Sequence, residues 1–302
     1  MDWLKIELQQ RDRIEEIRKN ADCVLLSHSF YTLLLWQETM RLSLYLEEDF
    51  FVVKYGLAGE NSYFCPCGNI EKTRKFIEEY ERKKDFQLFY IDEKRKNWLE
   101  EQFPEKLQLE YDRGGCEYIY DRQSHLLKQG KKYERIRREI HRLELKYRLS
   151  AERLTNENLS AGWNVIEKWQ KQNSEEKVGM IADDYLVAKN VMDYFYALEL
   201  KGVLIYVDGK PMATAIGGEI TQDTYAIWVA KMCERKEGLM FYLLEQLFLV
   251  IPSEYPYVNG DDDMNIEGIR IHKRKMKPCR MNEVWRAYTV RSRDGNEKSI
   301  YQ

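Results

Sequence analysis

The order of the predicted elements is the feature that most constrains how this chain can fold. In each half of the sequence, helical segments come first, three short strands follow, and helix, strand, helix and strand complete the series. The predicted helices span 10–41, 70–83, 93–103, 157–172, 183–200 and 239–250, and the predicted strands span 42–46, 50–55, 61–64, 86–90, 107–111, 117–120, 203–207, 212–220, 225–230, 255–259 and 283–290. The repeat exists only as a pattern, because the halves share no obvious identity. It predicts two mixed α/β domains side by side.

The length and composition fit a soluble protein with two ordinary domains. The chain has 302 residues, of which 44% are hydrophobic and 33% charged. Since 48 basic residues nearly balance 51 acidic ones, any contact with a nucleic acid or a lipid must be a local patch. The charged N-terminus lacks the apolar core of a signal peptide, and the most apolar run, Leu239–Ile251, is too short to cross a bilayer of roughly 30 Å. We therefore expect a cytoplasmic protein without a transmembrane segment.

The Cys, His and acidic residues do not form the pattern of a metal site or a catalytic triad. Only Cys65 and Cys67 lie close together among the six cysteines, so we expect all six to be reduced thiols. The acidic stretch that starts at Asp261 begins like a calcium loop, but Ile266 and His272 stand where that loop needs Gly and Glu. The four histidines are far apart, and His272 is expected at the surface. The sequence therefore predicts no metal.

A long basic helix is predicted over 128–149, as a linker between a first domain over 1–127 and a second over 150–302. Its apolar stripe consists of Tyr133, Ile136, Ile140, Leu143 and Tyr147. Nine cations against three anions on the other faces leave a local excess of six positive charges. The helix could guide a tRNA or an anionic membrane surface, with Lys132 and Arg135 as candidate substrate-binding residues. The alternative is an ordinary exposed helix face.

A turn with Arg235 and Gly238 precedes the apolar helix that starts at Leu239. A turn that opens a helix after a strand presents free backbone N–H groups to an anion. Arg235 and Gly238 have the R-x-x-G spacing found where N-acetyltransferase-like folds hold the pyrophosphate of coenzyme A. The turn is therefore a candidate substrate-binding site, and the alternative is a solvated turn.

The stretch Tyr257–Pro278 carries the sharpest motif in the chain. A short strand ends at Asn259, three aspartates follow, and a helix then accumulates cations. Part of this charge order suits the helix dipole. The residues that fit the pattern N-x-x-x-D-x-x-x-x-G-[LI]-R-x-x-K-x-x-x-x-P are Asn259, Asp263, Gly268, Ile269, Arg270, Lys273 and Pro278.

This motif resembles the C-terminal signature of the family typified by the cytosolic domain of phosphatidylglycerol lysyltransferase. Upstream features follow in the expected order: the aromatic helix before Trp36, the Gly130-Lys131-Lys132 stretch and the Asp208-Gly209 hairpin. Asn265 departs from the pattern, because a Gly usually stands there. The resemblance implies two tandem N-acetyltransferase-like domains and the transfer of an acyl or aminoacyl group.

Such a transfer needs groups that stabilise negative charge and hold the acceptor. Asp263 is the candidate to hold or deprotonate the acceptor, and Arg270 and Lys273 are candidates to contact phosphate or developing negative charge, with Asn259 as a further binding residue. We expect this site in the groove between the domains. The structural alternative is that Asp263 caps the following helix and pairs with Arg270.

The resemblance leaves two classes of function open. The first is an acyl- or aminoacyltransferase that uses an acyl-CoA or an aminoacyl-tRNA as donor substrate, with no required cofactor and an amine or hydroxyl as acceptor. The second is a non-catalytic binding module that retains the fold.

Overall fold

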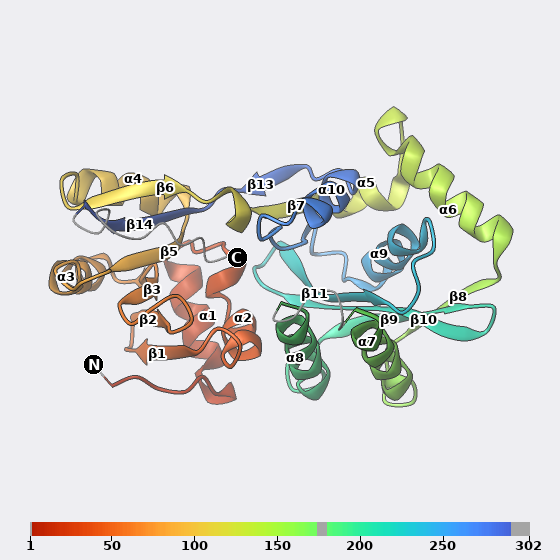
Figure 1. Ribbon diagram of the computed structural model, residues 1–302, viewed down its shortest axis with the longest axis horizontal. Helices are drawn as coiled ribbons and strands as arrows, with labels where there is room; N and C mark the ends of the chain where they lie inside the picture. Colours follow the sequence, from red (N-terminus) through yellow and green to blue (C-terminus); the bar gives the residue numbers. More distant parts are fainter. Residues whose placement is uncertain (1, 174–179, 291–302) are drawn as a thin grey trace. The chain divides into compact units, whose positions relative to one another are not determined.

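The computed structural model describes residues 2–173 and 180–290 and contains the mixed helices and strands that the sequence predicts (Figure 1). The α-helices are α1 Arg11–Asn20, α2 Phe30–Trp36, α3 Ile70–Tyr80, α4 Glu93–Gln102, α5 Arg122–Leu127, α6 Glu134–Lys146, α7 Leu159–Asn173, α8 Met180–Asp193, α9 Leu239–Val250 and α10 Glu267–Lys275. The strands are β1 Leu42–Leu46, β2 Phe50–Tyr55, β3 Ser62–Phe64, β4 Cys67–Gly68, β5 Gln87–Ile91, β6 Leu107–Tyr111, β7 Glu117–Asp121, β8 Leu149–Arg153, β9 Lys201–Val207, β10 Lys210–Glu219, β11 Thr224–Met232, β12 Tyr257–Asn259, β13 Arg280–Asn282 and β14 Trp285–Thr289.

Two mixed sheets contain these strands, which confirms the predicted fold class. The first has the order β1-β2-β3-β5-β14-β6, with β4 paired to β2. The second has the order β13-β7-β12-β11-β10-β9-β8. Strands β3 and β5 of the first sheet are parallel, as are β11 and β12 of the second. Both sheets therefore contain a meander of antiparallel strands followed by a parallel strand reached through a helix.

Two strands do not pair in the sheet that their place in the sequence suggests. The strand at 117–120 was expected in the first half, but β7 pairs with β12 of the second sheet. The strand at 283–290 was expected in the second half, but β14 lies between β5 and β6 of the first sheet. Short strands carry little information about distant partners, since pairing depends on which edge is free in the folded chain.

By its contacts, the chain forms two compact units that each draw on separate stretches of sequence. The first consists of Met1–Tyr118, Asp262–Arg270 and Met281–Gln302, and the second of Ile119–Asp261 and Ile271–Arg280. The helix predicted as a linker lies within the second unit. The boundaries at 127 and 150 stay a prediction about where domains begin and end.

In the first unit, strand β2 is buried on both faces of its sheet. Phe50 and Val52 join a core that includes Phe76 and Ile77 of α3 and Leu99 of α4. The alternate residues Phe51 and Val53 are also buried, each with 0% of its surface exposed. Since successive strand residues point to opposite faces, both faces of this strand must be covered.

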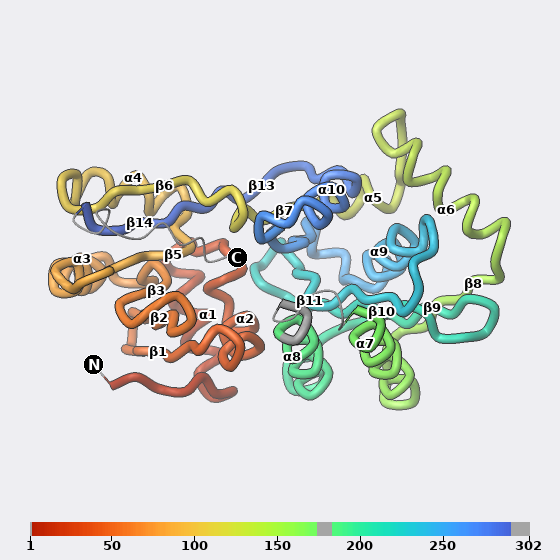
Figure 2. The backbone as a smooth tube through the Cα atoms, viewed as in Figure 1, coloured from red at the N-terminus to blue at the C-terminus, as the bar shows by residue number. Residues whose placement is uncertain are grey.

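In the second unit, the Asp208-Gly209 hairpin is confirmed. Both residues have positive φ, 51° and 77°, as a two-residue turn of this type needs. Figure 2 shows α7 and α8 on one face of the β9–β11 meander and α9 on the other. The apolar helix α9 buries Leu243, Leu247 and Phe248, so the run that is too short to span a membrane serves as a core helix.

The basic helix is shorter than predicted, because the chain bends before it. Lys128 and Gly130 both have positive φ, and α6 begins only at Glu134, after a short 3₁₀ turn over Lys131–Tyr133. The predicted stripe is otherwise correct, since Ile136, Ile140 and Leu143 are buried. These side chains face α9, and the cationic faces remain exposed.

The position of β14 between two strands makes Ala287 a sensitive site. Ala287 is 1% exposed and lies opposite Leu88 of β5 and Leu109 of β6. We expect Ala287→Asp to lower the free energy of unfolding by ~3 kcal/mol or more, because it buries an unpaired charge. Urea denaturation measures the change. The control is Val290→Asp, at a side chain that is 53% exposed; equal stability of the two variants would contradict the observed pairing.

Candidate functional site

The acidic turn between β12 and α10 is held by its own side chains. Asp261, Met264 and Asn265 have positive φ of 65°, 48° and 58°, which is uncommon for residues other than Gly. The side-chain oxygen of Asp262 accepts a hydrogen bond from the Met264 N–H at 3.0 Å, and Asp263 accepts one from Asn265 at 3.0 Å. Such local bonds offset part of the strain. Clustered strain of this kind is typical of functional sites.

A glycine in the first unit allows a second loop to approach this turn closely. Gly114 belongs to the 3₁₀ turn Arg113–Gly115, and its carbonyl accepts a hydrogen bond from the Met264 N–H at 3.0 Å. A Cβ atom at Gly114 would lie 2.4 Å from the side-chain nitrogen of Asn265. A side chain at this position would require Asn265 to move, and the close contact brings Arg113 beside the acidic turn.

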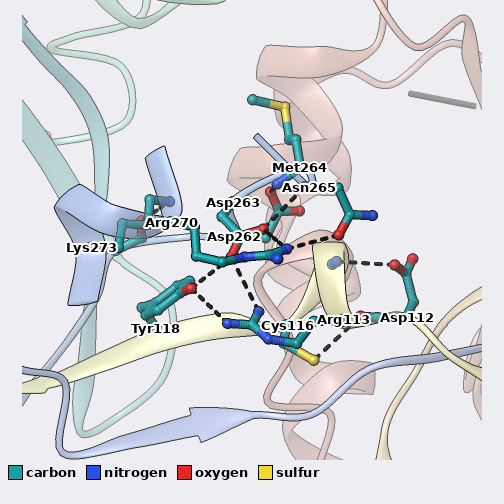
Figure 3. A network of polar contacts seen from close by, with 12 residues as sticks. Asp112, Arg113, Cys116, Tyr118, Asp262, Asp263, Met264, Asn265, Arg270 and Lys273 are labelled. Carbon is teal, nitrogen blue, oxygen red and sulfur yellow. Dashed lines mark hydrogen bonds and ion pairs between the residues drawn. The ribbon is translucent and has the colours of Figure 1, made fainter. Parts of the chain in front are cut away.

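Asp263 is the centre of a cluster in which two arginines and a tyrosine converge on one carboxylate (Figure 3). Its Oδ2 accepts hydrogen bonds from Tyr118 Oη at 2.6 Å, Arg270 Nε at 2.9 Å and Arg113 Nη1 at 3.2 Å. Its Oδ1 accepts from Arg270 Nη2 at 2.8 Å. Arg113 Nη2 also donates to Tyr118 Oη at 2.8 Å, and Arg270 Nη2 donates to Asn265 Oδ1 at 2.8 Å. We call these five residues the Asp263 cluster.

The Asp263 cluster contains two positive charges and one negative charge. Burial alone would raise the pKa of Asp263, but hydrogen bonds from Arg270 and Tyr118 and the charge of Arg113 lower it below its usual range. Asp263 is 0% exposed, whereas the side chains of Arg113 and Arg270 are 26% and 25% exposed. One buried anion therefore holds two partly exposed cations, and one positive charge is left over within the cluster.

Asn259 and Lys273 lie in the second unit, where they fix the end of β12. Asn259 is fully buried, and its Oδ1 accepts a hydrogen bond from the Asp261 N–H at 2.8 Å. Lys273 Nζ donates to the carbonyl oxygen of Gly260 at 2.7 Å. A Cβ at Gly260 would meet the Tyr120 ring at 2.5 Å, so this glycine is also needed for close packing. The motif residues thus shape the backbone on both sides of the acidic turn.

The turn with Arg235 and Gly238 lies against the basic helix. Gly238 begins α9 with φ 83°, and a Cβ there would lie 2.4 Å from the carbonyl oxygen of Glu139 in α6. Arg142 of α6 pairs with Glu237 at 3.8 Å. Arg235 is exposed. The packing of α6 on this turn accounts for the glycine, and the anion site at Arg235 and Gly238 stays a prediction.

The two predicted residues on the basic helix differ in their surroundings. Arg135 is exposed and donates from Nε to Glu139 Oε1 at 2.6 Å, whereas Lys132 lies over the Tyr133 ring at 5.5 Å. Exposed cations on this segment outnumber exposed anions, eight against two: Lys131, Lys132, Arg135, Arg137, Arg138, Arg142, Lys146 and Arg148 against Glu134 and Glu144. Both residues therefore belong to a basic surface in the second unit.

The sequence analysis missed Arg113 and Tyr118, and it misplaced His272. The Asp112-Arg113-Gly114-Gly115 turn after a strand was a usable signal for Arg113, since glycines at a turn allow close approach. Nothing local marks Tyr118 as a partner of a residue 145 positions away. His272 was expected at the surface, but its ring stacks on Phe241 with 5.9 Å between centroids. Stacking on an apolar helix accounts for its partly buried position.

The two sheets define a mixed α/β protein, and comparison with known proteins gives the family. The model of the family "Phosphatidylglycerol lysyltransferase, C-terminal" matches residues 25–288. The chain belongs to this family. The comparison with curated protein sequences found no match.

Solved structures share the fold over nearly the whole chain. A conserved protein of unknown function from Bacteroides thetaiotaomicron is 25% identical, with a TM-score of 0.86, over 95% of this chain and 99% of that one. The C-terminal domain of a putative lysylphosphatidylglycerol synthetase from Agrobacterium fabrum is 15% identical, with a TM-score of 0.64, over 92% and 91%. L-PGS from Bacillus licheniformis is 16% identical, with a TM-score of 0.62, over 97% and 94%.

These comparisons confirm the tandem N-acetyltransferase-like fold and the family resemblance. Family membership supports an acyl- or aminoacyltransferase-like function. Within residues 2–173 and 180–290, no helix is long and apolar enough to cross a membrane.

Asp263 should contribute stability that depends on pH. Asp263→Asn leaves Arg113 and Arg270 without their shared anion, so we expect the free energy of unfolding at neutral pH to fall by ~3–5 kcal/mol. Because the folded-state pKa is lowered, the contribution is complete above the unfolded-state value of about 3.9 and is lost as the pH falls through the lower folded value. Urea denaturation between neutral and acidic pH should show the two proteins converging below about pH 4.

The exposed Glu267, at the start of α10, provides the control for this prediction. Glu267→Gln should change stability by less than ~0.5 kcal/mol. An Asp263→Asn variant as stable as Glu267→Gln at neutral pH would contradict the proposed charge balance.

Proposed function

We propose that this protein transfers an aminoacyl group from a charged tRNA to an amine or hydroxyl acceptor, and that the Asp263 cluster binds the reacting groups. The observation that supports the proposal most is the convergence of two partly exposed arginine side chains on one buried carboxylate. In this reaction the acceptor attacks the ester carbonyl carbon, negative charge develops on the carbonyl oxygen, and the ribose oxygen of the tRNA leaves. Pre-oriented N–H donors stabilise such charge.

The two arginines supply these donors. A guanidinium has five N–H groups in a fixed plane. Arg270 uses Nε and Nη2 within the cluster, and its side chain is 25% exposed, so part of it can meet a substrate. Arg113 uses one N–H of Nη1 and one of Nη2. Both cations are held before the substrate arrives, which lowers the entropy cost of binding a phosphate, a carboxylate or an oxyanion.

Asp263 acts in this proposal as a positioning residue and not as a general base. Its oxygens already accept hydrogen bonds from Tyr118, Arg113, Arg270 and Asn265. A carboxylate with a lowered pKa is also a weak proton acceptor near neutral pH. The hypothesis that Asp263 deprotonates the acceptor is therefore less well supported than the hypothesis that it orients the arginines.

The basic surface of α6 supports a tRNA as the donor. Phosphate binding is largely electrostatic and needs clustered, exposed cations, as on this helix. We therefore favour an aminoacyl-tRNA over an acyl-CoA, and we place the activity in the cytoplasm, where tRNA is charged.

A non-catalytic binding module is the second candidate. The observation that favours it is that both carboxylate oxygens of Asp263 already accept hydrogen bonds. Neither oxygen is then free to take a proton from the acceptor. Such a module would bind charged tRNA without transferring its aminoacyl group.

A transfer assay tests the proposed role of the Asp263 cluster. Purified protein is mixed with radiolabelled aminoacyl-tRNA and with phosphatidylglycerol vesicles or small amines, and labelled product is measured. We expect Arg270→Gln to lower the transfer rate by ~10²-fold, because it removes donors to the developing oxyanion. Arg274→Gln, an exposed residue of the same helix, should leave the rate unchanged. Binding without transfer by the wild-type protein would favour the binding module.

Charge reversal tests the role of α6. Replacing Arg135, Arg138 and Arg142 with Glu should abolish tRNA binding and its steep salt dependence. The matched control reverses three exposed cations elsewhere in the second unit, Arg153, Lys201 and Lys210. Filter binding at several salt concentrations measures both. Equal loss in the two triple variants, or loss in neither, would rule out a specific role for α6.

A further inference from the structure

Strand β8 forms one edge of the second sheet (Figure 1). It stands last in the strand order, and it pairs with β9 from Leu149 opposite Val207 to Arg153 opposite Val203 without a register shift. Its last four residues are exposed. Proteins often protect an edge strand with a proline or a bulge, and β8 has neither. This edge can therefore pair with another strand.

The backbone groups of β8 alternate between its two sides. The Asp208 N–H donates to the carbonyl oxygen of Arg148 at 2.8 Å, and the Leu154 N–H donates to that of Gly202 at 2.9 Å. In an antiparallel pair, every second residue directs its N–H and C=O to the neighbouring strand. The even-numbered residues of this segment therefore bond to β9, and the odd-numbered ones direct their backbone groups to the open edge.

The open edge has three N–H groups and three carbonyl groups to offer. Within the described part of the chain, no hydrogen bond reaches the outward groups of Leu149 and Ala151. Arg153 offers only its N–H, because its carbonyl oxygen accepts from Asn158 Nδ2 at 2.9 Å. Tyr147 offers only its carbonyl oxygen, because its N–H donates to the last turn of α6 at 3.0 Å.

A second copy of the same strand complements these groups. In an antiparallel pair centred on Ser150, Leu149 faces Ala151 of the second copy, and Tyr147 faces Arg153 of the second copy. Each of the three free N–H groups then meets one of the three free carbonyl oxygens, and the two-fold symmetry gives three such bonds from each copy. The one N–H and the one C=O that are already used within the chain fall opposite each other.

The exposed charges of β8 favour the same register. Arg148 faces Glu152 of the second copy, and Glu152 faces Arg148, in pairs whose side chains lie close together. A register centred on Glu152 would place two carboxylates opposite each other. A register centred on Ala151 would need the Arg153 carbonyl, which Asn158 already occupies. The hydrogen bonds and the charges therefore select one arrangement.

We propose that this protein forms a symmetric dimer through β8, in which the second sheets of two copies become one continuous sheet. The pairing uses both open edges, so it ends at two copies. One short strand from each copy buries little surface, below ~1,200 Å², and we expect a dissociation constant in the micromolar range. This association does not depend on the proposed transfer reaction.

Sedimentation velocity of the full-length wild-type protein, from ~1 to ~200 µM, measures the association. We expect a shift from monomer to dimer as the concentration rises. Hydrogen exchange at the amides of Leu149, Ala151 and Arg153 should slow over the same range, and exchange in β6, an edge of the first sheet, should stay constant. A monomer throughout, or a dimer with unchanged exchange in β8, would overturn the proposal.

Charge variants test the register. Arg148→Glu and Glu152→Arg should each weaken the dimer ~10-fold or more, because like charges then face each other. An equal mixture of the two variants should form a heterodimer as tight as the wild-type dimer, since both facing pairs again have opposite charges. Glu152 also accepts hydrogen bonds from Tyr206 and Asn158 of its own chain, so circular dichroism checks the fold of each variant. A mixture that associates no better than either variant alone would rule out this register.

Ala151→Pro tests the backbone pairing. It removes an N–H that points away from β9, so the fold should remain while no dimer forms up to ~200 µM. The matched control is Ala151→Ser, which keeps the N–H and should dimerise like the wild-type protein. Dimerisation of the proline variant with wild-type affinity would show that the dimer forms elsewhere.

Discussion

The buried carboxylate of Asp263 is the constraint on which the candidate site depends. A fully buried anion is costly unless charges and hydrogen bonds compensate it. Here Arg113, Arg270 and Tyr118 do so at 2.6–3.2 Å. The charges and hydrogen bonds of the two arginines offset the cost of burying the anion. The same hydrogen bonds hold both arginines in place. The acidic turn around Asp263 also has positive φ at Asp261, Met264 and Asn265.

The glycines around the acidic turn show why the motif is more than an order of charges. Gly114 allows the turn with Arg113 to approach Asn265, and Gly260 allows β12 to pass beside Tyr120. Lys273 holds the Gly260 carbonyl, and Asn259 holds the Asp261 amide. Several motif residues thus build the backbone that supports the cluster, and the arginines carry the charge that a substrate would meet.

The sequence predicted local elements well and distant pairings poorly. Helix α9, the Asp208-Gly209 hairpin and the apolar stripe of α6 follow from periodicity and turn chemistry over a few residues. The exchange of β7 and β14 between the sheets depends on contacts across the whole chain, which no local pattern encodes. In the same way, the motif identified Asp263 and Arg270, whereas Arg113 and Tyr118 approach them only in the folded chain. The close packing of Gly238 on the Glu139 backbone of α6 is a further contact that the local turn pattern did not indicate.

We propose that Asp263 orients Arg113 and Arg270 toward a substrate. A crystal structure with a stable analogue of 3′-aminoacyl-adenosine 5′-phosphate tests this role most directly. We expect an oxygen atom of the analogue within hydrogen-bond distance of Arg113 or Arg270, with the bonds to Asp263 intact. An analogue bound elsewhere in the protein, with both arginines in contact only with the cluster, would contradict this role of Asp263.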